Sequence, residues 1–220
     1  MNLLQANTIF LFLLSLIVFL FIIQKLVKKK YPMYMWLIAI YLFLVFSQLV
    51  IGDYYDSFRP DLRGKRSPTA ISAYILIIAE YSIFVFLLSS YISLTFIKKY
   101  LIISCVLFAI VAISIWYSKL SFEKAISITT TVESLCLIPF CLFYFFELLN
   151  TPCFLKLTEE PSFWVTTGIL FLFISITPYY LAYDYFKNNI EMETLDFFGY
   201  DLLIVFLAKT SLTTFKHQNN

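Results

Sequence analysis

The segment from Leu157 to Tyr180, "LTEEPSFWVTTGILFLFISITPYY", joins two acidic residues to an almost unbroken apolar run. Pro161 suits the first turn of a helix, because the N–H group that it lacks would have no partner there. Trp164 follows at the depth where an indole ring bridges lipid headgroups and acyl chains. The segment therefore predicts a membrane interface followed by a transmembrane helix, and Pro178 predicts a kink near the far end of that helix.

The composition of the whole chain indicates the same environment. The 220 residues are 61% hydrophobic and 20% aromatic, whereas only about half of the residues in soluble domains are apolar. A transmembrane helix needs about 20 apolar residues, so a chain of this length has room for roughly seven spans and little else. We expect residues 1–220 to form a single all-α, polytopic helical bundle without a soluble domain.

Seven apolar stretches recur along the chain, separated by short polar segments. They run over residues 8–26, 33–51, 72–96, 100–117, 128–149, 163–183 and 194–215. The fourth stretch is the least clean because Lys98 and Lys99 adjoin it, so six helices are the alternative to seven.

The orientation follows from the lysines after the first stretch: Lys25, Lys28, Lys29 and Lys30. The positive-inside rule places that end in the cytoplasm, which puts the N-terminus outside and, after seven crossings, the C-terminus inside. This topology leaves nine Lys and Arg residues inside against seven outside, so the prediction depends mainly on the lysine cluster.

Part of the segment quoted first resembles a known group of proteins. The residues "EEPSFWVTTGILFLF", preceded by "ESLCLIPFCLFYFFELL", are similar to the fifth and sixth helices of small, uncharacterised seven-helix integral membrane proteins of Bacteroidota. The matching positions are Glu160, Pro161, Phe163, Trp164, Val165, Thr167, Gly168 and Leu170. The resemblance implies a multi-pass protein of a bacterial inner membrane, with a cytoplasmic signalling protein as partner. It assigns no functional residues.

The sequence lacks the residues that several classes of intramembrane enzyme use for catalysis. The only histidine, His217, lies in the terminal tail, which argues against zinc sites and serine–histidine dyads in the membrane. Glu159 and Glu160 have no histidine in a later span to work with. The cysteines are expected to act as small apolar residues without metal spacing: Cys105, Cys136, Cys141 and Cys153. We therefore expect neither enzymatic activity nor a metal or cofactor, and the charge pattern gives no reason to expect nucleic acid.

Acidic residues inside the predicted spans are the best candidates for function. A charge in hydrocarbon is costly, so Glu80, Glu133 and Asp201 should face the bundle interior or water. From the predicted outer ends, at 1.5 Å per residue, they lie about 12, 8 and 10 Å deep. Three acids at one level cannot all be ionised cheaply, which is a property that a proton-linked switch or a cation site would use.

Two tyrosines near Pro178 complete the candidate site. Tyr180 and Tyr183 lie at a similar depth in the sixth stretch, so an outward-facing polar pocket could be lined by the third, fifth, sixth and seventh stretches. The alternative is that each acid makes an unrelated hydrogen bond in helix packing.

Lys209 in the last stretch raises the possibility of a retinal-binding, rhodopsin-like protein. The nearest acid on that helix is Asp201, about 12 Å along the axis, and Val205 occupies the position one turn before the lysine. The expected counter-ion is therefore missing. The lysine stem can instead extend toward the cytoplasmic headgroups.

Three functions remain open at this point. The first is a small membrane sensor or signalling component with an outward-facing ligand pocket. The second is a carrier of a proton or small cation that uses the three acids. The third is a structural or assembly subunit. Four glycines in the whole chain weigh against the broken helices that transporters usually need.

Overall fold

The computed structural model describes residues 3–27, 32–58, 68–150, 154–186 and 190–217. Within these residues every regular element is a helix, which confirms the predicted all-α class. The α-helices are α1 (Leu3–Leu26), α2 (Met33–Phe58), α3 (Pro68–Tyr91), α4 (Thr95–Tyr117), α5 (Phe122–Leu149), α6 (Pro161–Leu181), α7 (Tyr183–Phe186) and α8 (Ile190–His217). A single 3-10 helix, η1 (Phe154–Glu159), precedes α6.

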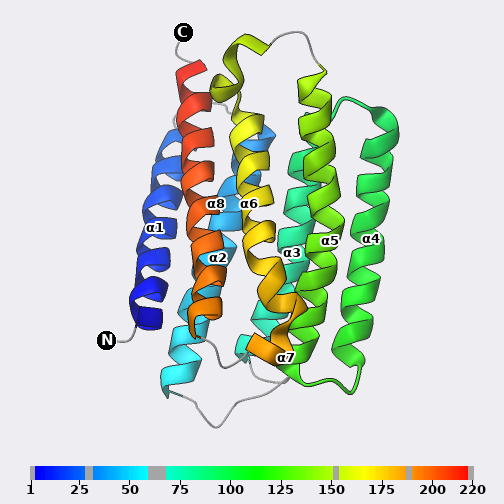
Figure 1. Ribbon diagram of the computed structural model, residues 1–220. Coiled ribbons are helices and arrows are strands. Elements are labelled where there is room, and N and C mark those ends of the chain that lie inside the picture. The colour runs from blue at the N-terminus through cyan, green and yellow to red at the C-terminus, as the bar shows by residue number, and fades with distance from the viewer. Residues whose placement is uncertain (1–2, 28–31, 59–67, 151–153, 187–189, 218–220) are drawn as a thin grey trace.

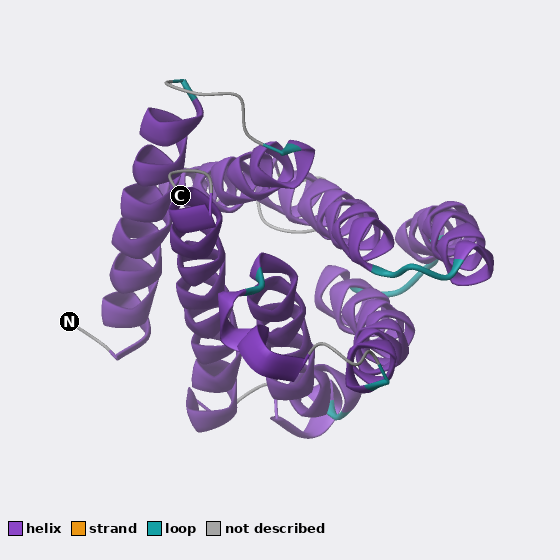
Figure 2. Cartoon of the chain, turned by 90° about the horizontal axis from the view of Figure 1, so that it is seen from above, coloured by secondary structure: helices purple, strands orange, loops and turns teal. Residues whose placement is uncertain are grey.

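The long helices run up and down in one bundle (Figure 1). One end carries η1 and the C-terminus, and is called the η1 end below. The other carries α7 and the start of α1, and is called the α7 end. α6 packs along α8 and α5, while α1 packs on α2 and α8. α4 stands at the edge of the bundle (Figure 2), where it packs against α3 and α5.

Five helices in the described residues are long and apolar enough to cross a membrane: α2, α3, α4, α5 and α6. α1 contributes a shorter apolar stretch, Ile9–Gln24. α8 is 28 residues long but is not among the five, and its sequence carries several acids together with Lys209. The structure is thus compatible with a multi-pass membrane protein, and seven crossings stay a prediction.

The predicted boundary between the third and fourth stretches is wrong. α3 ends at Tyr91 and α4 begins at Thr95, so Lys98 and Lys99 lie inside α4 and not in a loop. The turn has no glycine or proline to mark it. A carboxylate from another helix holds it, because Glu147 near the end of α5 accepts hydrogen bonds from the Ser93 hydroxyl and from its N–H (3.0 Å).

Close packing of α6 on α8 depends on a glycine. A methyl group on Gly168 would lie 3.0 Å from both the Leu203 Cδ1 and the Phe206 Cβ. Without a side chain at this position, the two helix backbones approach each other, as small residues allow in membrane bundles. Gly199 also allows close packing of the two helices, but with slightly more space. A methyl group there would lie 3.3 Å from its nearest neighbours.

Two prolines lie inside helices. α6 continues through Pro178 and ends one turn later at Leu181, where the Pro178 carbonyl accepts the Ala182 N–H at 3.2 Å. Its predicted kink would therefore act only on the last turn. Pro139 lies in α5, and the sequence interpretation made no use of it.

Candidate functional site

A cavity of about 320 Å³ lies between six helices in the half of the bundle nearest the α7 end. The lining residues come from the part of each helix between its middle and this end. The lining residues are Leu11 of α1; Val45, Gln48 and Leu49 of α2; Ala73, Leu76, Ile77 and Glu80 of α3; Ile126 and Thr130 of α5; Tyr180 of α6; and Tyr200 of α8. The walls are mostly apolar, with one carboxylic acid at the inner end.

Glu80 forms the floor of this cavity, since it is the lining residue of α3 farthest from the α7 end. Its side chain is 2% exposed. Tyr41 of α2 donates a hydrogen bond to its Oε1 at 2.9 Å, and Tyr200 of α8 donates a longer one to Oε2 at 3.4 Å. Two hydroxyl donors, one to each oxygen, are the surroundings that a carboxylate needs when it is removed from bulk water. The acid thereby connects α2, α3 and α8.

Glu133 lies beside this floor, at nearly the same depth as Glu80. It follows the lining residue Thr130 by nearly one turn of α5, is 1% exposed and lies close enough to Glu80 for their charges to interact. Among the described residues its Oε1 atom has no hydrogen-bond partner. A buried polar atom without a protein partner is costly, and each such atom is explained either by a functional role or by a water molecule that binds there.

The acids lie deeper than the sequence predicted. α3, α5 and α8 begin before the predicted stretches, at Pro68, Phe122 and Ile190. Counted from these ends at 1.5 Å per residue, Glu80 lies about 18 Å deep, and Glu133 and Asp201 about 16 Å. Each acid therefore lies near the middle of its own helix and not close to the helix end.

Asp201 does not share the cavity. It follows Tyr200 directly on α8, so its side chain leaves the helix about 100° away from the tyrosine that contacts Glu80. The side chain is half-buried, and its Oδ1 has no hydrogen-bond partner among the described residues. The structure therefore brings together two of the three predicted acids.

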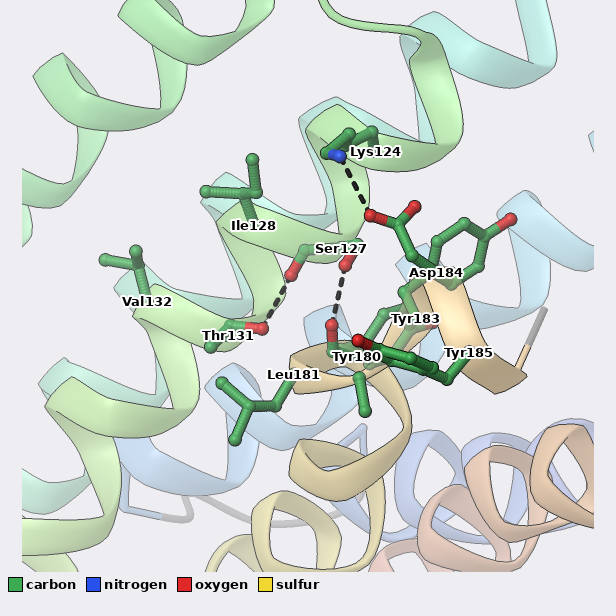
Figure 3. Close-up of a pocket in the computed structure, with 11 residues that line it drawn as sticks. Lys124, Ser127, Ile128, Thr131, Val132, Tyr180, Leu181, Tyr183, Asp184 and Tyr185 are labelled. Carbon is green, nitrogen blue, oxygen red and sulfur yellow. Dashed lines mark hydrogen bonds and ion pairs between the residues drawn. The ribbon is translucent and has the colours of Figure 1, made fainter.

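The two predicted tyrosines are also separated. Tyr180 lines the cavity, but Tyr183 lies in a second pocket on the side of the bundle, where its hydroxyl donates to Glu123 at 3.1 Å. This second pocket, of about 240 Å³, lies between α5, the end of α6 and α7 (Figure 3). Tyr180 lines both pockets, so the two adjoin.

The sequence interpretation missed the partners of Glu80. Tyr41 and Tyr200 are two of 16 tyrosines, and nothing in the sequence distinguishes them from those that only pack. Gln48, another missed residue, lines the cavity with an Oε1 atom that has no partner in the described part of the chain. The signal that could have identified Gln48 is its polar amide within an otherwise apolar stretch.

Lys209 lies far from these acids, toward the η1 end. Its Nζ is 5.6 Å from the centroid of the Trp164 ring, and Trp164 in turn donates to the Thr158 carbonyl at 2.8 Å. This arrangement is typical of a lysine that extends to the membrane interface over an aromatic ring.

In the described residues, no three or more His, Cys, Asp or Glu side chains are placed to hold a metal ion. The described cysteines Cys105, Cys136 and Cys141 are free thiols, and Cys153 lies outside the described residues. Chemically, the cavity offers one buried acid, phenol groups, an amide and an apolar wall, which suit binding of a small molecule.

Comparisons with protein-family models, curated proteins and solved structures found no match to this chain. The similarity to small membrane proteins of Bacteroidota remains a prediction from the sequence. The fold and the cavity define the class as an all-helical bundle with at least five helices suited to a membrane.

Proposed function

We propose that this chain is a multi-pass membrane sensor that binds a small organic cation in the cavity above Glu80. The observation that carries the proposal is a buried carboxylate, held by two tyrosines, at the inner end of a cavity lined by six helices. Cavities of about 300 to 1,000 Å³ with apolar walls and a few convergent polar groups are the usual form of ligand sites.

The composition of the cavity supports a cationic ligand with an apolar body. The described residues that line it include one acid and neither lysine nor arginine. Tyr180 and Tyr200 are among the lining residues, and aromatic rings attract ammonium groups. The aliphatic residues of α1, α2 and α3 would surround the rest of the ligand.

Seven crossings with the N-terminus outside would place the α7 end, and hence the cavity, on the outer side of a cell membrane. The lysine cluster after α1 supports this orientation. A ligand that engaged Glu80 would compete with Tyr41 of α2 and Tyr200 of α8 for the same oxygens. Because α8 continues to the η1 end, a shift of α8 could reach a cytoplasmic signalling partner there.

A second function, a carrier of a proton or small cation, is favoured by one observation. The Glu133 Oε1 lies buried without a hydrogen-bond partner among the described residues, next to a second acid. Such a pair could pass a proton onward from the cavity floor. In sealed liposomes, proton flux that Glu133→Gln abolishes would support the carrier, and absence of flux in the wild-type protein would exclude it.

A purely structural role is the third possibility. It predicts that each acid is retained for hydrogen bonds between helices. Glu80 fits that prediction, but the unpartnered oxygen of Glu133 does not.

Accessibility of the cavity tests the proposed sensor and its orientation together. In a variant without native cysteines, Ala73→Cys introduces a thiol into the cavity wall, and Ile75→Cys places one on a side chain of α3 that is 58% exposed on the outside of the bundle. A membrane-impermeant thiol reagent added to intact cells should label residue 73 and not residue 75. Benzylammonium should protect residue 73, and benzyl alcohol should not.

The opposite results would count against the proposal. Labelling of residue 73 only after the cytoplasmic side is opened would invert the orientation. Labelling from outside without protection by benzylammonium would argue against the cation site.

A further inference from the structure

We infer that the second pocket, on the side of the bundle, is a binding site for one zwitterionic phospholipid with an ethanolamine headgroup. The inference is independent of the proposed sensor function. This pocket is called the groove below. It is lined by residues 180–185 of α6, α7 and the turn between them, and by five residues of α5: Lys124, Ser127, Ile128, Thr131 and Val132.

The polar and apolar parts of the groove follow one another along the axis of α5. Lys124 lies in the first turn of α5, at the α7 end, whereas Val132 lies eight residues deeper, a rise of about 12 Å. Ile128, between them, and Leu181 of α6 extend the apolar part (Figure 3). The charged end therefore lies at the level of headgroups, and the apolar part at the level of acyl chains.

The charged end presents both signs. Lys124 Nζ lies 2.9 Å from Asp184 Oδ2, with the two side chains 46% and 61% exposed. An ion pair this exposed contributes little to stability, so a ligand can separate the two groups at low cost. A phosphate would then replace the carboxylate beside Lys124, and an ammonium group would replace the lysine beside Asp184.

Ethanolamine fits this pair better than other common headgroups. Its ammonium group has three N–H donors for the Asp184 carboxylate, and such charge-assisted hydrogen bonds are the strong ones. A choline headgroup has no N–H to donate, and a glycerol headgroup has no positive charge. Tyr183 and Tyr185, beside the pair, are residues typical of the headgroup region.

One backbone carbonyl in the groove already has a hydrogen-bond donor. Ser127 donates its hydroxyl to the Tyr180 carbonyl at 2.7 Å, near the end of α6 (Figure 3). An acyl chain can therefore lie against this surface without covering an unpaired carbonyl.

Lipid retention tests the inference. The full-length protein is reconstituted in phosphatidylcholine vesicles that contain a minority of either phosphatidylethanolamine or phosphatidylglycerol. It is then extracted in mild detergent, and native mass spectrometry identifies the lipids that remain bound. We expect the ethanolamine lipid to be enriched roughly tenfold over its share of the vesicle, as one net charge-assisted hydrogen bond would give.

Five variants locate the site. Asp184→Asn and Lys124→Gln should remove the enrichment, and Lys119→Gln, an exposed lysine before α5, should leave it unchanged. Val132→Trp fills the apolar part of the groove and should prevent retention. Leu135→Trp adds the same ring to a side chain that is 60% exposed on the same helix, and should not.

Retained lipid that follows the bulk composition of the vesicle would overturn the inference. Equal loss in Lys119→Gln and Lys124→Gln would also overturn it, as would equal loss in the two tryptophan variants.

Discussion

Replacing each of the paired acids by methionine should change stability in opposite directions. Glu133→Met removes a carboxyl group that is 1% exposed and has an oxygen without a partner among the described residues. An unsatisfied buried polar group costs about 1–3 kcal/mol, so its removal should raise the free energy of unfolding by up to that amount. Methionine has a similar length and adapts to an irregular site, which limits the packing cost.

Glu80→Met should have the reverse effect. It removes the acceptor of the 2.9 Å hydrogen bond from Tyr41, whose side chain is 1% exposed. The buried hydroxyl loses its partner, which should lower the free energy of unfolding by about 1–3 kcal/mol. Adding Tyr41→Phe to Glu80→Met should recover much of this loss, since both partners are then apolar.

Reversible unfolding in mixed micelles, titrated with denaturing detergent and followed by tryptophan fluorescence, compares the three variants with the wild-type protein. If Glu133→Met lowers stability as much as Glu80→Met does, Glu133 is a packing residue. The case for a functional acid beside the cavity floor would then fail.

Further consequences follow from the helix contacts. Gly168→Ala should lower the free energy of unfolding by about 1–3 kcal/mol, because the added methyl group overpacks against α8. Gly199→Ala has more space and should be close to neutral. The same unfolding titration compares the two variants. Equal effects would contradict the difference in fit. Glu147→Ala should lower the free energy of unfolding by about 1–2 kcal/mol, because the Ser93 N–H loses its acceptor at the α3–α4 turn. Exchange of the Ser93 amide hydrogen with deuterium should accelerate, and an unchanged rate would contradict this role of Glu147.

Periodicity and composition were sufficient to predict the class of fold. Apolar stretches of about 20 residues have few alternatives to a helix in a membrane, because every backbone group must be satisfied within the segment. The boundaries were harder to predict. Lys98 and Lys99 looked like a loop because they are charged, yet a helix continues through them, and the real turn at Ser93 is held by Glu147, 54 residues away.

The candidate site was predicted in part for a similar reason. The depth of an acid can be counted along a helix, so the sequence allowed a similar depth to be predicted for Glu80, Glu133 and Asp201. The direction in which each side chain points depends on how the helices are rotated against one another. The helices have no consistently polar face, so the sequence does not determine that rotation. Asp201 therefore could not be distinguished from Tyr200, its neighbour, which contacts Glu80.

Direct binding of a cation is the most decisive measurement. Isothermal titration of benzylammonium into the protein in nanodiscs, with empty nanodiscs and benzyl alcohol as references, reports whether the cavity has a cation site. We expect saturable binding at one site per chain that Glu80→Gln removes and Glu160→Gln, an exposed acid at the η1 end, leaves intact. Binding that is equal for the alcohol, or that survives Glu80→Gln, would contradict the assignment of Glu80 as the ligand's counter-ion.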